Sequence, residues 1–140
     1  MLPFTVCPVG DTAVLACFEQ RIAQEIGASV TALNLRVAAA RIPGVVETVP
    51  AFASLLVFYD PLQTDYDAVA SAVQALAQTA DGNAAAGQGR LVEIPVCYGG
   101  SFGPDLPFVA KHAGLSEQEV IARHAGREYR IYMLGFLPGF

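Results

Sequence analysis

Along the first 80 residues, the spacing of apolar side chains switches twice from the period of a strand to that of a helix. Two short apolar runs are followed by a stripe of apolar residues three or four apart, which forms one face of a helix, and the order then recurs. The expected strands are residues 4–7, 13–18, 45–49 and 54–59, and the expected helices are residues 22–37 and residues from about 64 onward. This order predicts an α+β fold, a ββαββα two-layer sandwich with both helices on one face of an antiparallel sheet.

A stretch of small and polar residues at 81–89 interrupts this pattern and is typical of a linker, because it has nothing to bury. The pattern restarts with strand-type runs at residues 91–98 and 129–134. Between them, Asp105 is the expected cap of one short helix, and Ser116 opens a second helix with a capping box. The expected domains are residues 1–80 and residues 90–140, joined by the linker.

The composition limits the classes of partner. Lys and Arg number 8 and Asp and Glu number 13, which gives a net charge of −5. A nucleic-acid partner is therefore not expected, because binding phosphates needs a surplus of cations. Hydrophobic residues make up 54% of the chain and charged residues 15%, which excludes a disordered protein. This balance indicates either an Ala-rich core or an apolar surface that a partner covers.

The chain has no apolar run of the roughly 20 residues that span a membrane, and its N-terminus lacks the regions of a signal peptide. Its cysteines, Cys7, Cys17 and Cys97, are odd in number and too sparse for a disulfide framework. This cysteine usage favours a reducing compartment. We expect a cytoplasmic protein with no membrane partner, with Cys7 and Cys17 in its core.

A glycine-rich segment lies between an expected strand and a helix, a layout typical of a phosphate-binding loop. It lacks the Lys followed by Ser or Thr of a Walker A loop, and Asp105 would repel an anion. In one interpretation, the segment at residues 99–104 is a tight connection that needs positive φ angles. In the other, it is the wall of a site for a neutral or amide-like ligand, and Asp105 accepts a hydrogen bond.

The spacing of His112 and His124 does not fit a metal site, because no Cys, Asp or Glu lies at ligand spacing nearby. His124 falls late in its helix, where it either settles on the helix dipole or acts as a general acid or base. Three tyrosines either supply hydroxyls to a cleft or pack as amphipathic side chains, namely Tyr98, Tyr129 and Tyr132. Cys97 is either a partner of His124 or a small buried hydrophobe.

Residues 135–140 read GFLPGF, an apolar ending with two Gly-Phe pairs around a Pro. Natural chain ends are usually polar and exposed. We therefore expect that the chain is a fragment of a longer protein, or that a partner covers this end. Phe136 and Phe140 are expected either to pack under a missing domain or to form the aromatic wall of a binding cleft.

Three segments, in order, resemble those of one known family. They are PAFASLLVFYDP at residues 50–61, IPVCYGG with GPDL between residues 94 and 106, and EVIARHAGREYRIYMLGFLPGF at residues 119–140. The chain thus resembles the B subunit of the bacterial ATP-dependent 5-oxoprolinase, a family also known as KipI-like or allophanate hydrolase subunit 1. The family corresponds to subdomains C and D of the carboxyltransferase domain in urea amidolyase.

The resemblance implies a small α+β domain followed by a cyclophilin-like β-barrel, of which residues 90–140 would be an incomplete start. It implies a hydrolase subunit that acts with subunits A and C, as a hetero-oligomer, to convert 5-oxo-L-proline to L-glutamate with ATP. The ATP site is expected outside this chain, no metal is expected within it, and the chain alone is expected to be inactive.

Alternatives from the same family are a KipI-like inhibitor that binds a sensor histidine kinase, and a subunit of an allophanate hydrolase or urea amidolyase. For the enzyme, His124 is the expected proton donor or acceptor, and Asp105 the expected acceptor from an amide N–H. The expected substrate-binding residues are Tyr98, Gly99, Gly100, Phe136 and Phe140.

Overall fold

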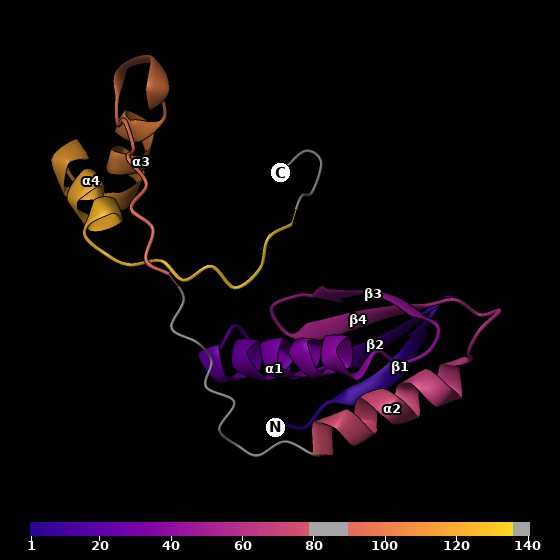
Figure 1. Ribbon diagram of the computed structural model, residues 1–140. Helices are drawn as coiled ribbons and strands as arrows, with labels where there is room; N and C mark the ends of the chain where they lie inside the picture. The colour runs from indigo at the N-terminus through magenta and orange to yellow at the C-terminus, as the bar shows by residue number, and fades with distance from the viewer. Residues whose placement is uncertain (79–89, 136–140) are drawn as a thin grey trace. The chain divides into compact units, whose positions relative to one another are not determined.

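The computed structural model describes residues 1–78 and 90–135 (Figure 1). The described residues form two compact units, residues 1–78 with residues 131–135, and residues 90–130. The expected linker at residues 81–89 lies outside the described ranges, so the domain boundaries stay a prediction.

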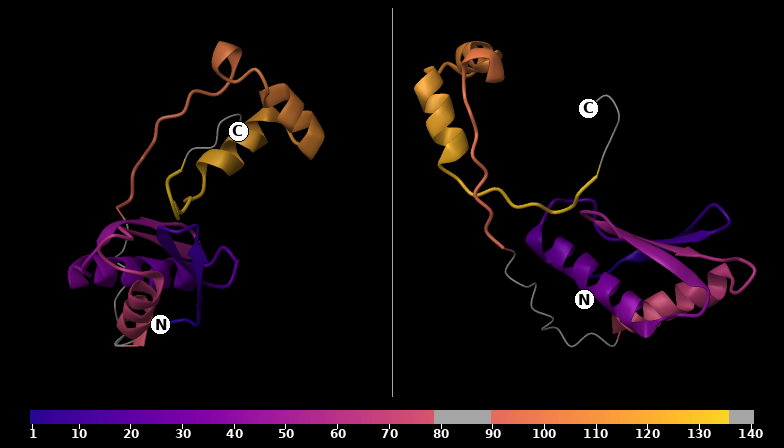
Figure 2. Two further views of the ribbon diagram at one scale, coloured as in Figure 1. Left: turned by 90° about the vertical axis from the view of Figure 1, so that its right-hand side faces the viewer. Right: turned by 45° about the horizontal axis from the view of Figure 1, so that its top comes forward.

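The first unit has the predicted order of two strands, a helix, two strands and a helix. Its elements are β1 (Thr5–Val9), β2 (Ala13–Cys17), α1 (Gln24–Ala40), β3 (Val45–Pro50), β4 (Ser54–Tyr59) and α2 (Tyr66–Gln78). The strands form one antiparallel sheet in the order β1-β2-β4-β3. Figure 2 shows α1 and α2 on the same side of this sheet. The predicted combination of an antiparallel sheet with helices on one face is thus confirmed.

The core of this unit lies between the sheet and the two helices. Alternate residues of the central strands face the helices, as the period of a strand requires. The largest buried side chains are Val14, Leu55 and Val57 from the sheet, Ile26, Val30, Leu33 and Val37 from α1, and Val69 and Val73 from α2. Each such side chain contributes about 1.5–3 kcal/mol when it leaves water. This shared interior fixes which face of the sheet the helices cover.

Both helices of this unit begin later than the apolar pattern predicts. Helix α1 begins at Gln24, so Ile22 precedes it and is 70% exposed rather than part of the buried stripe. Helix α2 begins at Tyr66, because the Asp65 carboxylate accepts a hydrogen bond of 2.8 Å from the backbone N–H of Ala68. A side-chain acceptor at this position satisfies an N–H that has no partner within the helix.

The second unit contains a short 3₁₀ helix, η1 (Gly100–Phe102), and two α-helices, α3 (Leu106–Ala113) and α4 (Glu117–Ala125). The predicted capping box at the start of α4 is confirmed. The expected side-chain cap of α3 is wrong, because Asp105 makes no such hydrogen bond. Its backbone already has helical angles, φ −86° and ψ −8°, whereas a capping residue is extended so that its side chain can turn back.

The strands expected at residues 91–98 and 129–134 are not formed. Both segments lack strand pairing, and no neighbouring strand among the described residues offers them a ladder of hydrogen bonds. Apolar alternation indicates an extended segment, but a strand also needs a partner. The barrel that the resemblance implies is therefore not seen in residues 90–135. Within the described ranges, none of the helices has the length and apolar character needed to cross a membrane.

Candidate functional site

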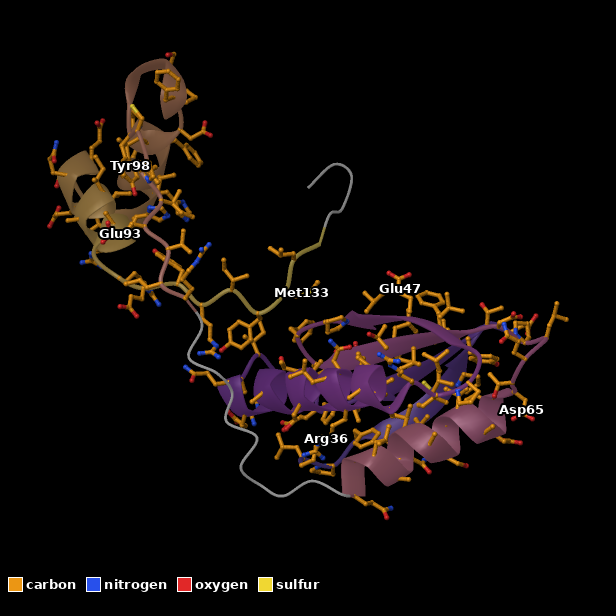
Figure 3. All side chains as sticks on the ribbon, in the orientation of Figure 1. Arg36, Glu47, Asp65, Glu93, Tyr98 and Met133 are labelled. Carbon is orange, nitrogen blue, oxygen red and sulfur yellow. The ribbon has the colours of Figure 1, made fainter. Side chains whose placement is uncertain are left out.

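Tyr98 and His124 meet in the second unit although 26 positions separate them in the chain. The Tyr98 hydroxyl is hydrogen-bonded to Nδ1 of the His124 ring. The two rings meet edge to face, with centroids 5.6 Å apart and an angle of 80° between their planes. Tyr98 is half-buried and His124 is exposed, and Figure 3 shows Tyr98 beside α4. The structure thus brings together two of the residues that the sequence singles out.

The capping box of α4 fixes the start of the helix that carries His124. The Ser116 backbone N–H donates to the Glu119 carboxylate at 2.8 Å, and the Glu119 N–H donates to the Ser116 hydroxyl oxygen at 3.3 Å. Two hydrogen bonds from Ser116 hold the pKa of Glu119 below its ordinary value. The bond from the backbone N–H is the larger cause, and the bond from the hydroxyl is the second. The box satisfies N–H groups that otherwise lack partners, and it therefore stabilises α4. His124 lies in the last turn of this helix.

The glycine-rich loop directly follows Tyr98. Gly99 and Gly100 have φ angles of 95° and 55°, a region that favours glycine, which is the geometry that the tight-connection interpretation predicts. A Cβ added to Gly103 would lie 2.6 Å from the backbone nitrogen of Gly99, so the loop closes upon itself. The chain therefore reverses directly after Tyr98 and continues through η1 toward α3.

Two further residues extend the pair: Tyr129, which the sequence indicates as a possible source of a hydroxyl, and Arg127, which the sequence does not indicate. The Tyr129 ring lies 5.5 Å from the His124 ring, between centroids, and the Arg127 guanidinium lies 5.2 Å from the Tyr129 centroid. An Arg over an aromatic face is attracted by the ring quadrupole. The only sequence signal for Arg127 is its position directly after the helix that carries His124, and this signal is weak.

The Tyr98–His124 pair can move a proton. When the Tyr98 hydroxyl donates to Nδ1, the neutral imidazole carries its own proton on Nε2, which can then be given to a ligand. When the ring is protonated, Nδ1–H donates to the Tyr98 oxygen instead. A hydrogen bond at one ring nitrogen thus orients the ring and leaves the other for acid or base chemistry.

The structure does not join the other expected site residues to this pair. Asp105 is exposed before α3, and its side chain does not cap that helix. Cys97 is exposed, so the interpretation of a buried hydrophobe is wrong. Phe136 and Phe140 lie outside the described residues. No group of three or more His, Cys, Asp or Glu residues in the described part of the chain is placed to hold a metal ion.

Residues 4–140 match the family model of the carboxyltransferase domain, subdomain C and D. The chain belongs to this family. Both members of the Tyr98–His124 pair lie within the matched span, as do the four strands and both helices of the first unit.

This carboxyltransferase-family chain is similar to proteins named as the B subunit of 5-oxoprolinase. It is 41% identical over 143 residues to the one from Bacillus subtilis (strain 168), and 35% identical over 133 residues to the one from Escherichia coli O157:H7. Each alignment covers 94% of this chain and 59% of the relative. The chain thus spans about three fifths of the length of these curated relatives.

Two solved structures are also similar to this family member. The conserved uncharacterized protein PH0987 from Pyrococcus horikoshii is 40% identical, with a TM-score of 0.52 over 96% of this chain and 61% of that one. The crystal structure of TTHA0988 in space group P212121 is 35% identical, with a TM-score of 0.70 over 91% of this chain and 24% of that one.

Proposed function

We propose that this chain forms part of the B subunit of an ATP-dependent 5-oxoprolinase, which hydrolyses 5-oxo-L-proline to L-glutamate. The observation that carries the proposal is 41% identity, across 94% of this chain, to a protein named as the B subunit of 5-oxoprolinase. A second relative of that name, 35% identical over the same share of the chain, supports it.

Hydrolysis of a cyclic amide breaks the C–N bond of the ring and adds water to the carbonyl carbon. The departing nitrogen must gain a proton before it leaves as an amine, so a general acid lowers the barrier. In this proposal His124 gives that proton from Nε2, while the Tyr98 hydroxyl at Nδ1 holds the ring in position. Asp105 and the loop at Gly99 and Gly100 bind the substrate, with the Asp105 carboxylate accepting a hydrogen bond from the amide N–H.

The proposed enzyme needs further subunits, which we take to be subunits A and C, and it binds ATP outside this chain. Exposed apolar side chains in the second unit support a partner. Ile94 is 72% exposed, Phe102 is 78% exposed and Phe108 is 71% exposed. Removing such side chains from water is a driving force for protein association. Partner subunits would remove these groups from water.

Reconstitution tests the proposal. The full-length protein that carries this sequence is mixed with subunits A and C, and glutamate released from 5-oxoproline is measured with and without ATP. We expect glutamate only when all three subunits and ATP are present. The same mixture is offered allophanate as the competing substrate. Turnover of allophanate with no release of glutamate would overturn the proposal.

A further inference from the structure

Two cysteines share the face of the sheet that no helix of the first unit covers. Cys7 lies on β1 and Cys17 on β2, and the antiparallel register pairs Cys7 with Leu15 and Thr5 with Cys17. The neighbouring β2 residue Ala16 points into the core. Because side chains alternate along a strand, Cys17 and its diagonal neighbour Cys7 both point to the opposite, helix-free face. The expectation that they belong to the core is therefore wrong, and both are half-buried.

The two thiols are diagonal neighbours on adjacent strands of this face. Burial, and then the nearby Cys7 thiol, raise the pKa of the Cys17 thiol. The Cys7 thiol donates to the backbone oxygen of Leu15, at a sulfur-to-oxygen distance of 3.8 Å.

Solvent reaches Cys17 through an open hollow. Cys17 lines a cavity of about 600 Å³ together with Thr5, Glu19 and Ser54. The hollow lies at the end of the sheet where Thr5, Cys17 and Ser54 are cross-strand neighbours. A small ion can thus approach the Cys17 thiol without unfolding the sheet, and the Cys7 thiol on the same face is itself only half-buried.

The register opposes a disulfide between these cysteines. Diagonal neighbours on antiparallel strands have Cα atoms about 7–8 Å apart. A disulfide needs Cα atoms about 4.4–6.8 Å apart and Cβ atoms about 3.5–4.5 Å apart, so the bond would require backbone movement. The sheet therefore keeps two thiols close to each other on one face in an arrangement that opposes a disulfide bond between them.

We propose that Cys7 and Cys17 form a two-thiolate site for a soft monovalent cation of the Cu(I) class, a function separate from the proposed hydrolysis. Metal–thiolate bonds are about 2.3 Å long, so two sulfurs on opposite sides of one ion lie up to about 4.6 Å apart, which diagonal side chains can span. Each thiol loses its proton to solvent as its sulfur binds the ion, and no oxidation state changes. Thiolate ligands select soft ions such as Cu(I). Zinc prefers four ligands, which this pair does not provide.

Titration with Cu(I) under anaerobic conditions, against a chromophoric Cu(I) chelator, tests the site in the intact chain. We expect one ion per chain in the wild type and in Cys97→Ser. Cys7→Ser and Cys17→Ser should each weaken binding at least about 100-fold, because loss of a ligand costs more than loss of a supporting group. Zn(II) should bind far more weakly than Cu(I). Cu(I) binding that is unchanged in Cys7→Ser and in Cys17→Ser would overturn the proposal. Loss of Cu(I) binding in Cys97→Ser would also overturn it.

A second measurement does not depend on how the variants fold. The wild-type chain is treated with oxidised glutathione and digested with trypsin, which leaves Cys7 and Cys17 together in the peptide of residues 1–21. We expect no loss of two hydrogens from this peptide. Prompt formation of an internal disulfide would contradict the geometry on which the cation site depends.

Discussion

The hydroxyl of Tyr98 is hydrogen-bonded to Nδ1 of His124, and this contact joins the end of an extended segment to the last turn of α4. The hydrogen bond fixes the orientation of an exposed ring that would otherwise rotate freely. The chemical role proposed for His124 depends on this orientation.

Tyr98→Phe removes that hydrogen bond and keeps the aromatic ring. We expect kcat of the assembled enzyme to fall about tenfold with little change in KM, because a misplaced acid reduces the rate more than it reduces binding. The ¹⁵N shifts of His124 should also change, since Nδ1 loses its partner. The control is Tyr129→Phe, which removes a hydroxyl that makes no hydrogen bond to His124 among the described residues. Equal kinetics for the two variants would remove Tyr98 from the positioning role.

Acid should weaken the start of α4 through Glu119. The pKa of this carboxyl is lowered from its ordinary value of 4.5, first by the Ser116 N–H and then by the Ser116 hydroxyl. A lowered pKa in the folded state contributes stability that is present above the unfolded value and is lost as pH falls through the folded value. The ¹³C shift of the Glu119 carboxyl should therefore titrate below pH 4.5, and the α4 amides should lose protection in the same range.

Ser116→Ala provides the matched variant for this titration. It removes the hydroxyl and keeps the backbone N–H, which is the larger cause of the shift. We expect the titration midpoint of the Glu119 carboxyl to rise only part of the way toward its ordinary value of 4.5. A wild-type midpoint at or above 4.5 would show that the capping box does not hold the carboxylate in solution.

Two leucines of α1 allow a test of the core. Leu33 is fully buried, whereas Leu35, two residues later, is 63% exposed. Leu33→Ala should lower the free energy of unfolding by about 2–5 kcal/mol, because it leaves a cavity as well as losing apolar contact. Leu35→Ala should change it by no more than about 0.5 kcal/mol. Urea denaturation followed by circular dichroism measures both, and similar losses would contradict the packing described for α1.

The turn before β3 requires glycine at residue 44. Gly44 has a φ of 79°, and an added Cβ would lie 2.6 Å from Cγ2 of Thr64. Gly44→Ala should therefore destabilise the chain by more than about 1 kcal/mol, since backbone strain and a steric clash act together. Gly10 has a φ of 57° but no atom within 4 Å of the added Cβ. Gly10→Ala should therefore cost less, and thermal unfolding that ranks the two variants the other way would refute this account of the turn.

The sequence predicts those parts of the fold that depend on local patterns. The four strands of the first unit, the buried stripe from Ile26 to Val37 and the capping box at Ser116 all follow from spacing within a few residues. Ile22 fits the same helical period but precedes α1, because the period does not show where a helix begins. The start of α2 likewise depends on one hydrogen bond to Asp65.

Features that depend on distant residues could not be predicted in this way. The segments at residues 91–98 and 129–134 have the alternation of strands but no strand partner in the described ranges, and pairing is not a local property. The sequence indicates Tyr98 and His124 separately as site candidates, yet their contact follows from how the loop after Tyr98 turns back. The positions of Arg127 and Tyr129 beside His124 depend on the same turn.

The account rests on His124 as the acid of the proposed 5-oxoprolinase, and the chain provides its own control in its second histidine. His112 stacks on Phe108, with centroids 6.2 Å apart, whereas the Tyr98 hydroxyl is hydrogen-bonded to His124. In the assembled enzyme, His124→Ala should reduce ATP-dependent release of glutamate at least about tenfold, whereas His112→Ala should leave it unchanged. Full activity in His124→Ala, or an equal loss in both variants, would contradict the role assigned to the Tyr98–His124 pair.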